Sequence, residues 1–156
     1  MNTPIKFVSL ERWPHKPTNP LKKVRSRFRV TSTQMYKLLD RELGHLAARD
    51  VLFQTFHSSG SIRGDGQPRA NSYPSQPGFI LTFKNKSGEV LSFPCDTYPS
   101  MEENLYAVAL SLEALRRVDR YGVTKNQEQY RGWKQLGSGS GPVGETYETS
   151  LEFFSQ

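Results

Sequence analysis

Two segments with helical periodicity, one on each side of a strand-rich stretch, constrain the fold most. Residues 31–48 begin with Thr31 and Gln34 spaced as in a capping box, and residues 100–120 begin with Ser100 and Glu103 in the same relation. Each segment repeats apolar residues at three- and four-residue intervals, so each needs a partner surface for one face. The apolar positions are Met35, Leu38, Leu39, Leu43 and Leu46 in the first segment, and Leu105, Val108, Ala109, Leu112 and Leu115 in the second.

Four short segments have the composition or the alternation of β-strands. Residues 51–56 are rich in β-formers, and residues 79–83 and 90–93 flank a polar turn, which predicts a hairpin. Residues 22–30 alternate between apolar and cationic side chains, as a half-buried strand does. The predicted order is β-α-β-β-β-α, which indicates the α+β class: a small antiparallel or mixed sheet with two helices.

The chain divides into three regions by composition. Residues 1–21 contain four prolines, which remove backbone donors, so we expect an extended N-terminal arm. Residues 22–136 are predicted to form the single α+β domain. Residues 137–156 begin with GSGSG and are expected to be a flexible linker with an acidic, aromatic C-terminal tail. Within the domain, residues 58–77 lack periodicity, and a loop of this length is either functional or mobile.

The distribution of charge points to a polyanion as a partner. The chain holds 21 Lys and Arg against 15 Asp and Glu; no cation follows Lys134, whereas three of the acids do, so residues 1–136 carry an excess of nine positive charges. Such an excess favours nucleic acid, and guanidinium groups along one strand face suit a phosphate backbone. The predicted nucleic-acid-binding residues are Lys22, Lys23, Arg25, Arg27 and Arg29, with Arg63 and Arg69 as loop contacts.

Two other interpretations of these features stay open. The cationic strand face is equally consistent with a solvated edge that prevents strand-to-strand aggregation. The C-terminal tail has the composition of a short docking motif, which makes a protein-interaction adapter the alternative function. Its predicted partner-binding residues are Tyr147, Glu148, Phe153 and Phe154.

The sequence argues against most catalytic and metal sites. The three histidines are far apart and outside the HxxxH spacing, and no Walker loop or GxSxG elbow is present, so we expect no metal and no cofactor. The helix and strand order also matches the core of restriction-endonuclease-like nucleases, but the acid-x-Lys pair of those enzymes is missing. A nuclease with an unusual site is the remote alternative, and its candidate acids are Glu42, Glu89 and Asp96.

The single cysteine, Cys95, excludes an intrachain disulfide and indicates a reducing compartment. The sequence has no long apolar run and no charged-then-apolar leader. We therefore expect a cytoplasmic protein with no membrane partner.

Several motifs resemble the N-terminal region of certain bacterial DnaJ-like proteins, a module that precedes their J domain. The motifs are DGQPRAN (65–71), PGFILTF (77–83), PCDTYPSMEENLYAVALSLEALRRVDRYGV (94–123) and EQYRGWKQL (128–136). The chain lacks the J domain and its His-Pro-Asp tripeptide, so stimulation of Hsp70 cannot be carried over. The resemblance implies a stand-alone module used without the chaperone part.

Overall fold

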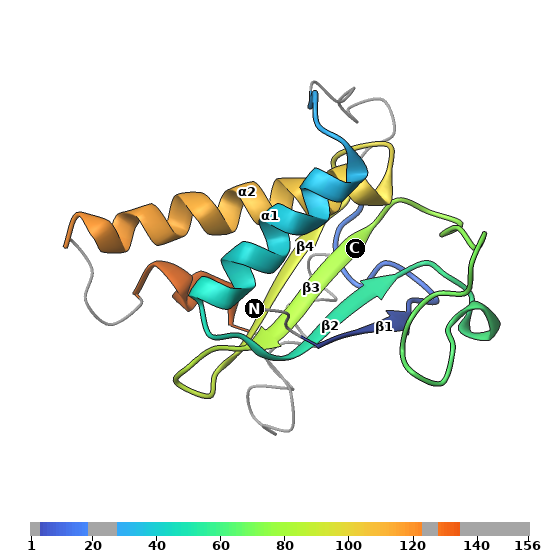
Figure 1. Ribbon diagram of the computed structural model, residues 1–156, viewed down its shortest axis with the longest axis horizontal. Coiled ribbons are helices and arrows are strands. Elements are labelled where there is room, and N and C mark those ends of the chain that lie inside the picture. The colour runs from blue at the N-terminus through green and yellow to red at the C-terminus, as the bar shows by residue number, and fades with distance from the viewer. Residues whose placement is uncertain (1–3, 19–27, 123–127, 135–156) are drawn as a thin grey trace.

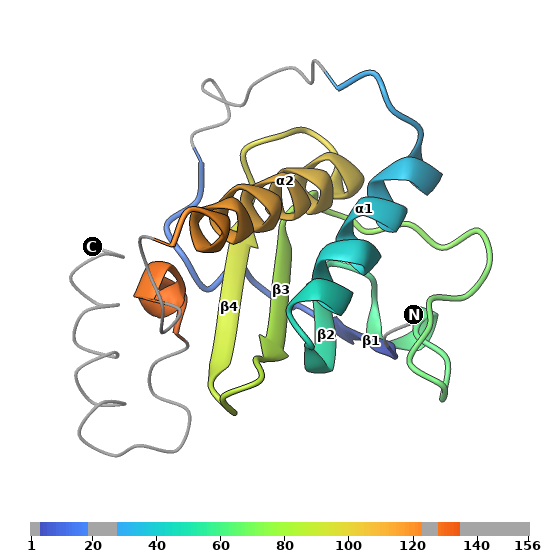
Figure 2. The same cartoon turned by 60° about the vertical axis from the view of Figure 1, so that its left-hand side comes forward.

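The computed structural model describes residues 4–18, 28–122 and 128–134. These residues form a four-stranded mixed sheet with two α-helices on one face (Figures 1 and 2). The strand order is β1-β2-β3-β4; β1 and β2 are parallel, and the other neighbours are antiparallel. The elements are β1 (Ile5–Ser9), α1 (Ser32–His45), β2 (Arg49–Thr55), the 3-10 helix η2 (Ser59–Ser61), β3 (Phe79–Lys84), β4 (Val90–Cys95), α2 (Met101–Arg120) and the 3-10 helix η3 (Glu128–Trp133).

Both predicted helices are confirmed, together with their caps. Thr31 and Gln34 form the reciprocal capping box of α1, and the Ser100 hydroxyl accepts the Glu103 amide at the start of α2. The first helix was expected to continue to Ala48 but ends at His45, because Ala47 adopts a left-handed φ of 53°. The hairpin of β3 and β4 is confirmed as well, with each strand slightly longer than predicted.

The core lies between the sheet and the two helices. The strand register places Phe7, Phe53, Leu81 and Phe93 in one row across the sheet. This row faces the helices, where it meets the buried side of α1 and α2. The most fully buried helical leucines are Leu39, Leu43, Leu105 and Leu112.

The first strand of the predicted order is elsewhere in the sequence. Of the segment predicted as a cationic strand, residues 22–27 lie outside the described residues, and Phe28, Arg29 and Val30 belong to no strand. The strand is instead β1, which alternates half-buried and exposed residues and pairs with β2 over its whole length. The prediction that residues 1–21 form an arm outside the domain is therefore wrong for residues 5–9. Pro4 and Pro14 flank this strand without entering it, so they do not break its hydrogen bonding.

Other segments cover both edges of the sheet. On the β1 side, the Phe7 amide donates to the Gly66 carbonyl at 2.7 Å, and the Gln67 amide group donates to the Ile5 carbonyl at 2.6 Å. On the β4 side, Lys134 pairs with Leu91. Gly66 has a φ of 84°, and a Cβ there would lie 2.9 Å from Lys6 Cγ, so the loop lies this close to β1 because residue 66 is glycine. These contacts cover part of each edge strand, which reduces the surface available for strand-to-strand aggregation.

Within the described residues, no helix has the length and apolar character needed to cross a membrane.

Candidate nucleic-acid interface

The strongest concentration of charge is residues 12–29, which we call the basic segment. It contains seven Lys and Arg and no Asp or Glu. Residues 12–18 lie across the strand ends: the Trp13 ring packs near Phe56, with a centroid distance of 6.3 Å, and fills the space beside Gly78. The carboxylate of Asp96, which directly follows β4, accepts hydrogen bonds from the Thr18 backbone amide, at 2.8 Å, and from the Thr18 hydroxyl. The described N-terminal part of the basic segment thus contacts the rest of the fold at three residues, Phe56, Gly78 and Asp96.

The C-terminal end of the basic segment is attached to the same region. The ring of Phe28 contacts Tyr98, with centroids 5.2 Å apart, and meets Tyr106 edge-to-face at 4.8 Å. Tyr98 lies two residues after Asp96 in the connection between β4 and α2. Thr18 and Phe28, the last described residues on each side of the gap, therefore both rest on this short connection.

Asn104 holds the β4–α2 connection in place. This fully buried side chain donates to the carbonyls of Pro77, at 2.8 Å, and Tyr98, at 3.1 Å. Its oxygen accepts the Tyr98 amide at 2.8 Å and the Cys95 thiol at 3.3 Å. Because buried amides are costly when unpaired, four such bonds fix the loop from the first turn of α2.

The predicted binding residues have different outcomes. Lys22, Lys23, Arg25 and Arg27 lie outside the described residues, and Arg29 is exposed. The two loop arginines bind other residues of the same loop. Arg63 forms an ion pair with Asp65, and Arg69 donates a hydrogen bond to the Gly60 carbonyl at 3.1 Å. Hydrogen bonding within the pair raises the pKa of Arg63 and lowers that of Asp65. The loop arginines thus stabilise the turn that covers β1.

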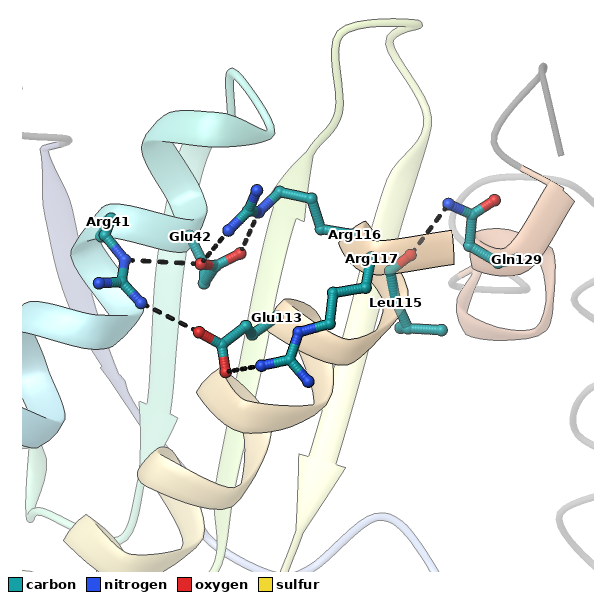
Figure 3. Close-up of polar contacts among 7 residues, drawn as sticks. All are labelled: Arg41, Glu42, Glu113, Leu115, Arg116, Arg117 and Gln129. Carbon is teal, nitrogen blue, oxygen red and sulfur yellow. Dashed lines mark hydrogen bonds and ion pairs between the residues drawn. The ribbon is translucent and has the colours of Figure 1, made fainter. Parts of the chain in front are cut away.

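Two arginines near the end of α2, Arg116 and Arg117, form ion pairs, and Arg116 reaches across to α1 (Figure 3). Arg116 holds the fully buried Glu42 carboxylate with two hydrogen bonds, of 2.7 and 3.1 Å, while Glu113 receives Arg41 at 3.1 Å and Arg117 at 3.2 Å. Hydrogen bonding to Glu42 raises the pKa of Arg116. Arg116 joins the two helices through Glu42 and Arg41 joins them through Glu113, whereas the contact of Arg117 with Glu113 lies within α2.

The three candidate nuclease acids are not brought together. Glu42 is bound by Arg116 between the helices, while Glu89 and Asp96 lie beyond opposite ends of β4. Lys134 pairs with Glu89 and lowers its pKa by hydrogen bonding. The described ranges contain no cluster of three His, Cys, Asp or Glu side chains that could hold a metal ion.

Two histidines lie close to the strand ends and are desolvated. His57 is 4% exposed, with its Nδ1 2.7 Å from the Thr55 hydroxyl, and burial lowers its pKa. His15 packs edge-to-face on Trp13, and burial lowers its pKa as well, although the negative charge of Asp96 partly offsets this effect.

Sequence reasoning missed the anchors of the basic segment and could not assess the tail. The Thr18–Asp96 contact joins residues 78 positions apart, and no local pattern marks it. The sequence shows Gly78 directly before β3, but nothing in it connects Gly78 with Trp13. The predicted partner-binding residues Tyr147, Glu148, Phe153 and Phe154 lie outside the described residues.

Comparison with known proteins adds no relatives: no protein-family model, no curated protein and no solved structure matches this chain. The resemblance to the module of DnaJ-like proteins therefore stays a prediction. Function must be argued from the geometry of the chain itself.

Proposed function

We propose that the protein binds nucleic acid without catalysis, through the phosphate backbone, and that the basic segment is its contact surface. The observation that carries this proposal is the shared attachment of the segment's two ends. Thr18 binds Asp96 and Phe28 packs on Tyr98, so the described residues on both sides of the intervening cations meet at one end of the sheet. These fixed flanking residues support binding because their freedom does not have to be lost when a ligand arrives.

The charges of the segment suit a polyanion rather than a single acidic group. Arg12, Lys16 and Arg29 are exposed, and four further cations lie between the two anchors in the sequence. The seven cations are separated by no acid, so ion pairs within the segment do not neutralise them. Most cations elsewhere in the fold that we have described are held by a neighbouring carboxylate or carbonyl. The basic segment is therefore the best-supported phosphate contact.

The proposal predicts affinity that falls steeply with salt, because each neutralised phosphate releases counterions. We would titrate labelled single- and double-stranded DNA and RNA by fluorescence anisotropy at about 50 and about 200 mM salt. The test variant replaces Arg25, Arg27 and Arg29 with Gln. The matched control removes three exposed cations from the far end of the sheet, Lys86, Arg120 and Arg131.

The expected result is a large loss of affinity and a flatter salt dependence for the test variant, with the control close to the parent chain. Equal losses in both variants would show that only net charge matters. An unchanged affinity in the test variant at both salt concentrations would overturn the proposal.

A further inference from the structure

The outer side of α1 contains an open hollow that neither the core nor the basic segment uses. Its volume is about 670 Å³. The described residues that line it all belong to α1, at positions three or four residues apart, on the side opposite the buried Leu39 and Leu43. They are Thr33, Tyr36, Lys37, Asp40, Arg41, Gly44 and His45.

This hollow combines the aromatic ring of Tyr36 with a rim that carries two cations, Lys37 and Arg41, and one acid, Asp40, so the rim has a formal net charge of +1. The Tyr36 ring is half-buried, and Gly44 leaves open space, with no atom within 4 Å of an added Cβ. Lys37, Arg41 and His45 follow one another at four-residue intervals and are exposed, although Arg41 is shared with Glu113. Asp40 is the acidic side chain of the lining, which disfavours a bare phosphate backbone there. A ligand with aromatic groups and a few carboxylates fits these features better.

We propose that residues 145–154 of the same chain bind in this hollow. That segment reads ETYETSLEFF: it contains three Glu, no Lys or Arg, and the aromatic side chains Tyr147, Phe153 and Phe154. Its charge is opposite to that of the rim, and its aromatic residues supply groups for the space beside Tyr36 and Gly44. Electrostatic complementarity of this kind mainly sets specificity, and buried aromatic anchors supply most of the affinity.

The length of the chain allows the segment to reach α1. The last described residue, Lys134, is attached to β4, and Tyr130 in the preceding η3 lies close enough to feel the charge of Glu42 in α1. Residues 134 to 145 are eleven peptide steps apart, which span at most roughly 36–40 Å. With 14 residues, α1 is roughly 21 Å long, which is shorter than this span. This inference does not depend on the proposed function.

Paramagnetic relaxation in the full-length chain tests the inference. A nitroxide is attached to Ser150→Cys in a Cys95→Ser background, where the serine hydroxyl can replace the thiol donor to Asn104. We expect loss of the amide signals of Lys37, Arg41 and His45, and their recovery once the label is reduced. A second sample mixes isotope-labelled chains without nitroxide and nitroxide-bearing chains without isotope; no signal loss is expected there.

Two charge-reversal variants decide whether the contact is specific. Lys37→Glu with His45→Glu should abolish the signal loss, whereas Lys86→Glu with Arg120→Gln, which lowers the formal net charge by the same amount, should preserve it. Replacing Tyr147, Phe153 and Phe154 with Ala should weaken it as well. The inference is overturned by signal loss at another surface, by no loss, or by comparable loss in the mixed sample, which would mean that the occupant is a second copy.

Discussion

At the scale of single residues, Gly78 decides whether Trp13 can lie on the sheet. A Cβ at position 78 would lie 2.6 Å from Trp13 Cζ3, 2.7 Å from Cε3 and 3.1 Å from Phe56 Cε2, closer than real Cβ contacts allow. Gly78→Ala should therefore displace the indole and destabilise the fold by about 1–3 kcal/mol, as overpacking usually does. Urea unfolding gives the free energy, and tryptophan emission in a Trp133→Phe background should shift to longer wavelength.

Gly60→Ala is the matched control for this prediction. An added Cβ at position 60 meets no atom within 4 Å, so the same substitution should leave both stability and emission nearly unchanged. If Gly78→Ala keeps the parent emission spectrum, Trp13 does not rest beside Gly78 in solution.

At the scale of elements, α1 and α2 are joined by a buried ion pair. Glu42 is fully buried and Arg116 keeps 20% of its side-chain exposure, so Glu42→Gln leaves a cation facing a site without a countercharge. Breaking such a pair from one side should lower the free energy of unfolding by about 3 kcal/mol, measured by urea denaturation. Replacing both Glu42 and Arg116 with Met should recover much of this loss, because no charge is then left unpaired.

The comparison for this prediction is Glu113→Gln, in the same helix pair. Glu113 pairs with Arg41 and Arg117, which are 56% and 54% exposed, so water screens both interactions. The expected loss is below about 1 kcal/mol. Equal effects at positions 42 and 113 would contradict the role given to the buried pair.

Element type was predictable from sequence where local chemistry determines it. The capping residues and apolar spacing of α1 and α2, and the polar turn between β3 and β4, correctly predicted those four elements. The first strand was assigned to the wrong segment, because alternation in residues 22–30 is a stronger local signal than the short Ile5–Ser9 strand between prolines. What fixes β1 is its pairing with β2 and with Gly66, contacts that depend on residues far away in the sequence.

At the scale of the whole molecule, the candidate site was only half predictable. Charge counting indicated the basic segment, since charge is a property of the sequence itself. Counting also proposed Arg63 and Arg69 as loop contacts but could not show their partners in the fold: Arg63 pairs with Asp65, and Arg69 donates to the Gly60 carbonyl. The anchors of the segment, Thr18 and Phe28, were missed because their partners are adjacent only after folding.

The two desolvated histidines, His15 and His57, should make the stability of the fold depend on pH. Burial lowers the pKa values of His15 and His57 below the ordinary 6.5, so the unfolded chain takes up protons more readily as pH falls. Well above pH 6.5 both side chains are neutral in either state and contribute no pH dependence. Below it the free energy of unfolding should fall, with a limiting slope of about 1.4 kcal/mol per pH unit for a histidine that stays neutral in the fold.

Urea unfolding between pH 8 and pH 5.5 measures this slope while staying above the range in which the carboxylates Asp65 and Glu89 titrate. His57→Gln keeps a polar group near the Thr55 hydroxyl, and together with His15→Gln it should flatten the profile. His45→Gln, on the exposed side of α1, serves as the comparison variant. The basic segment is held at Trp13 and Thr18, next to His15. If protonation of His15 loosens this attachment, the proposed affinity for nucleic acid should weaken over the same pH range. An affinity that stays constant while stability falls would show that the two histidines affect the fold alone.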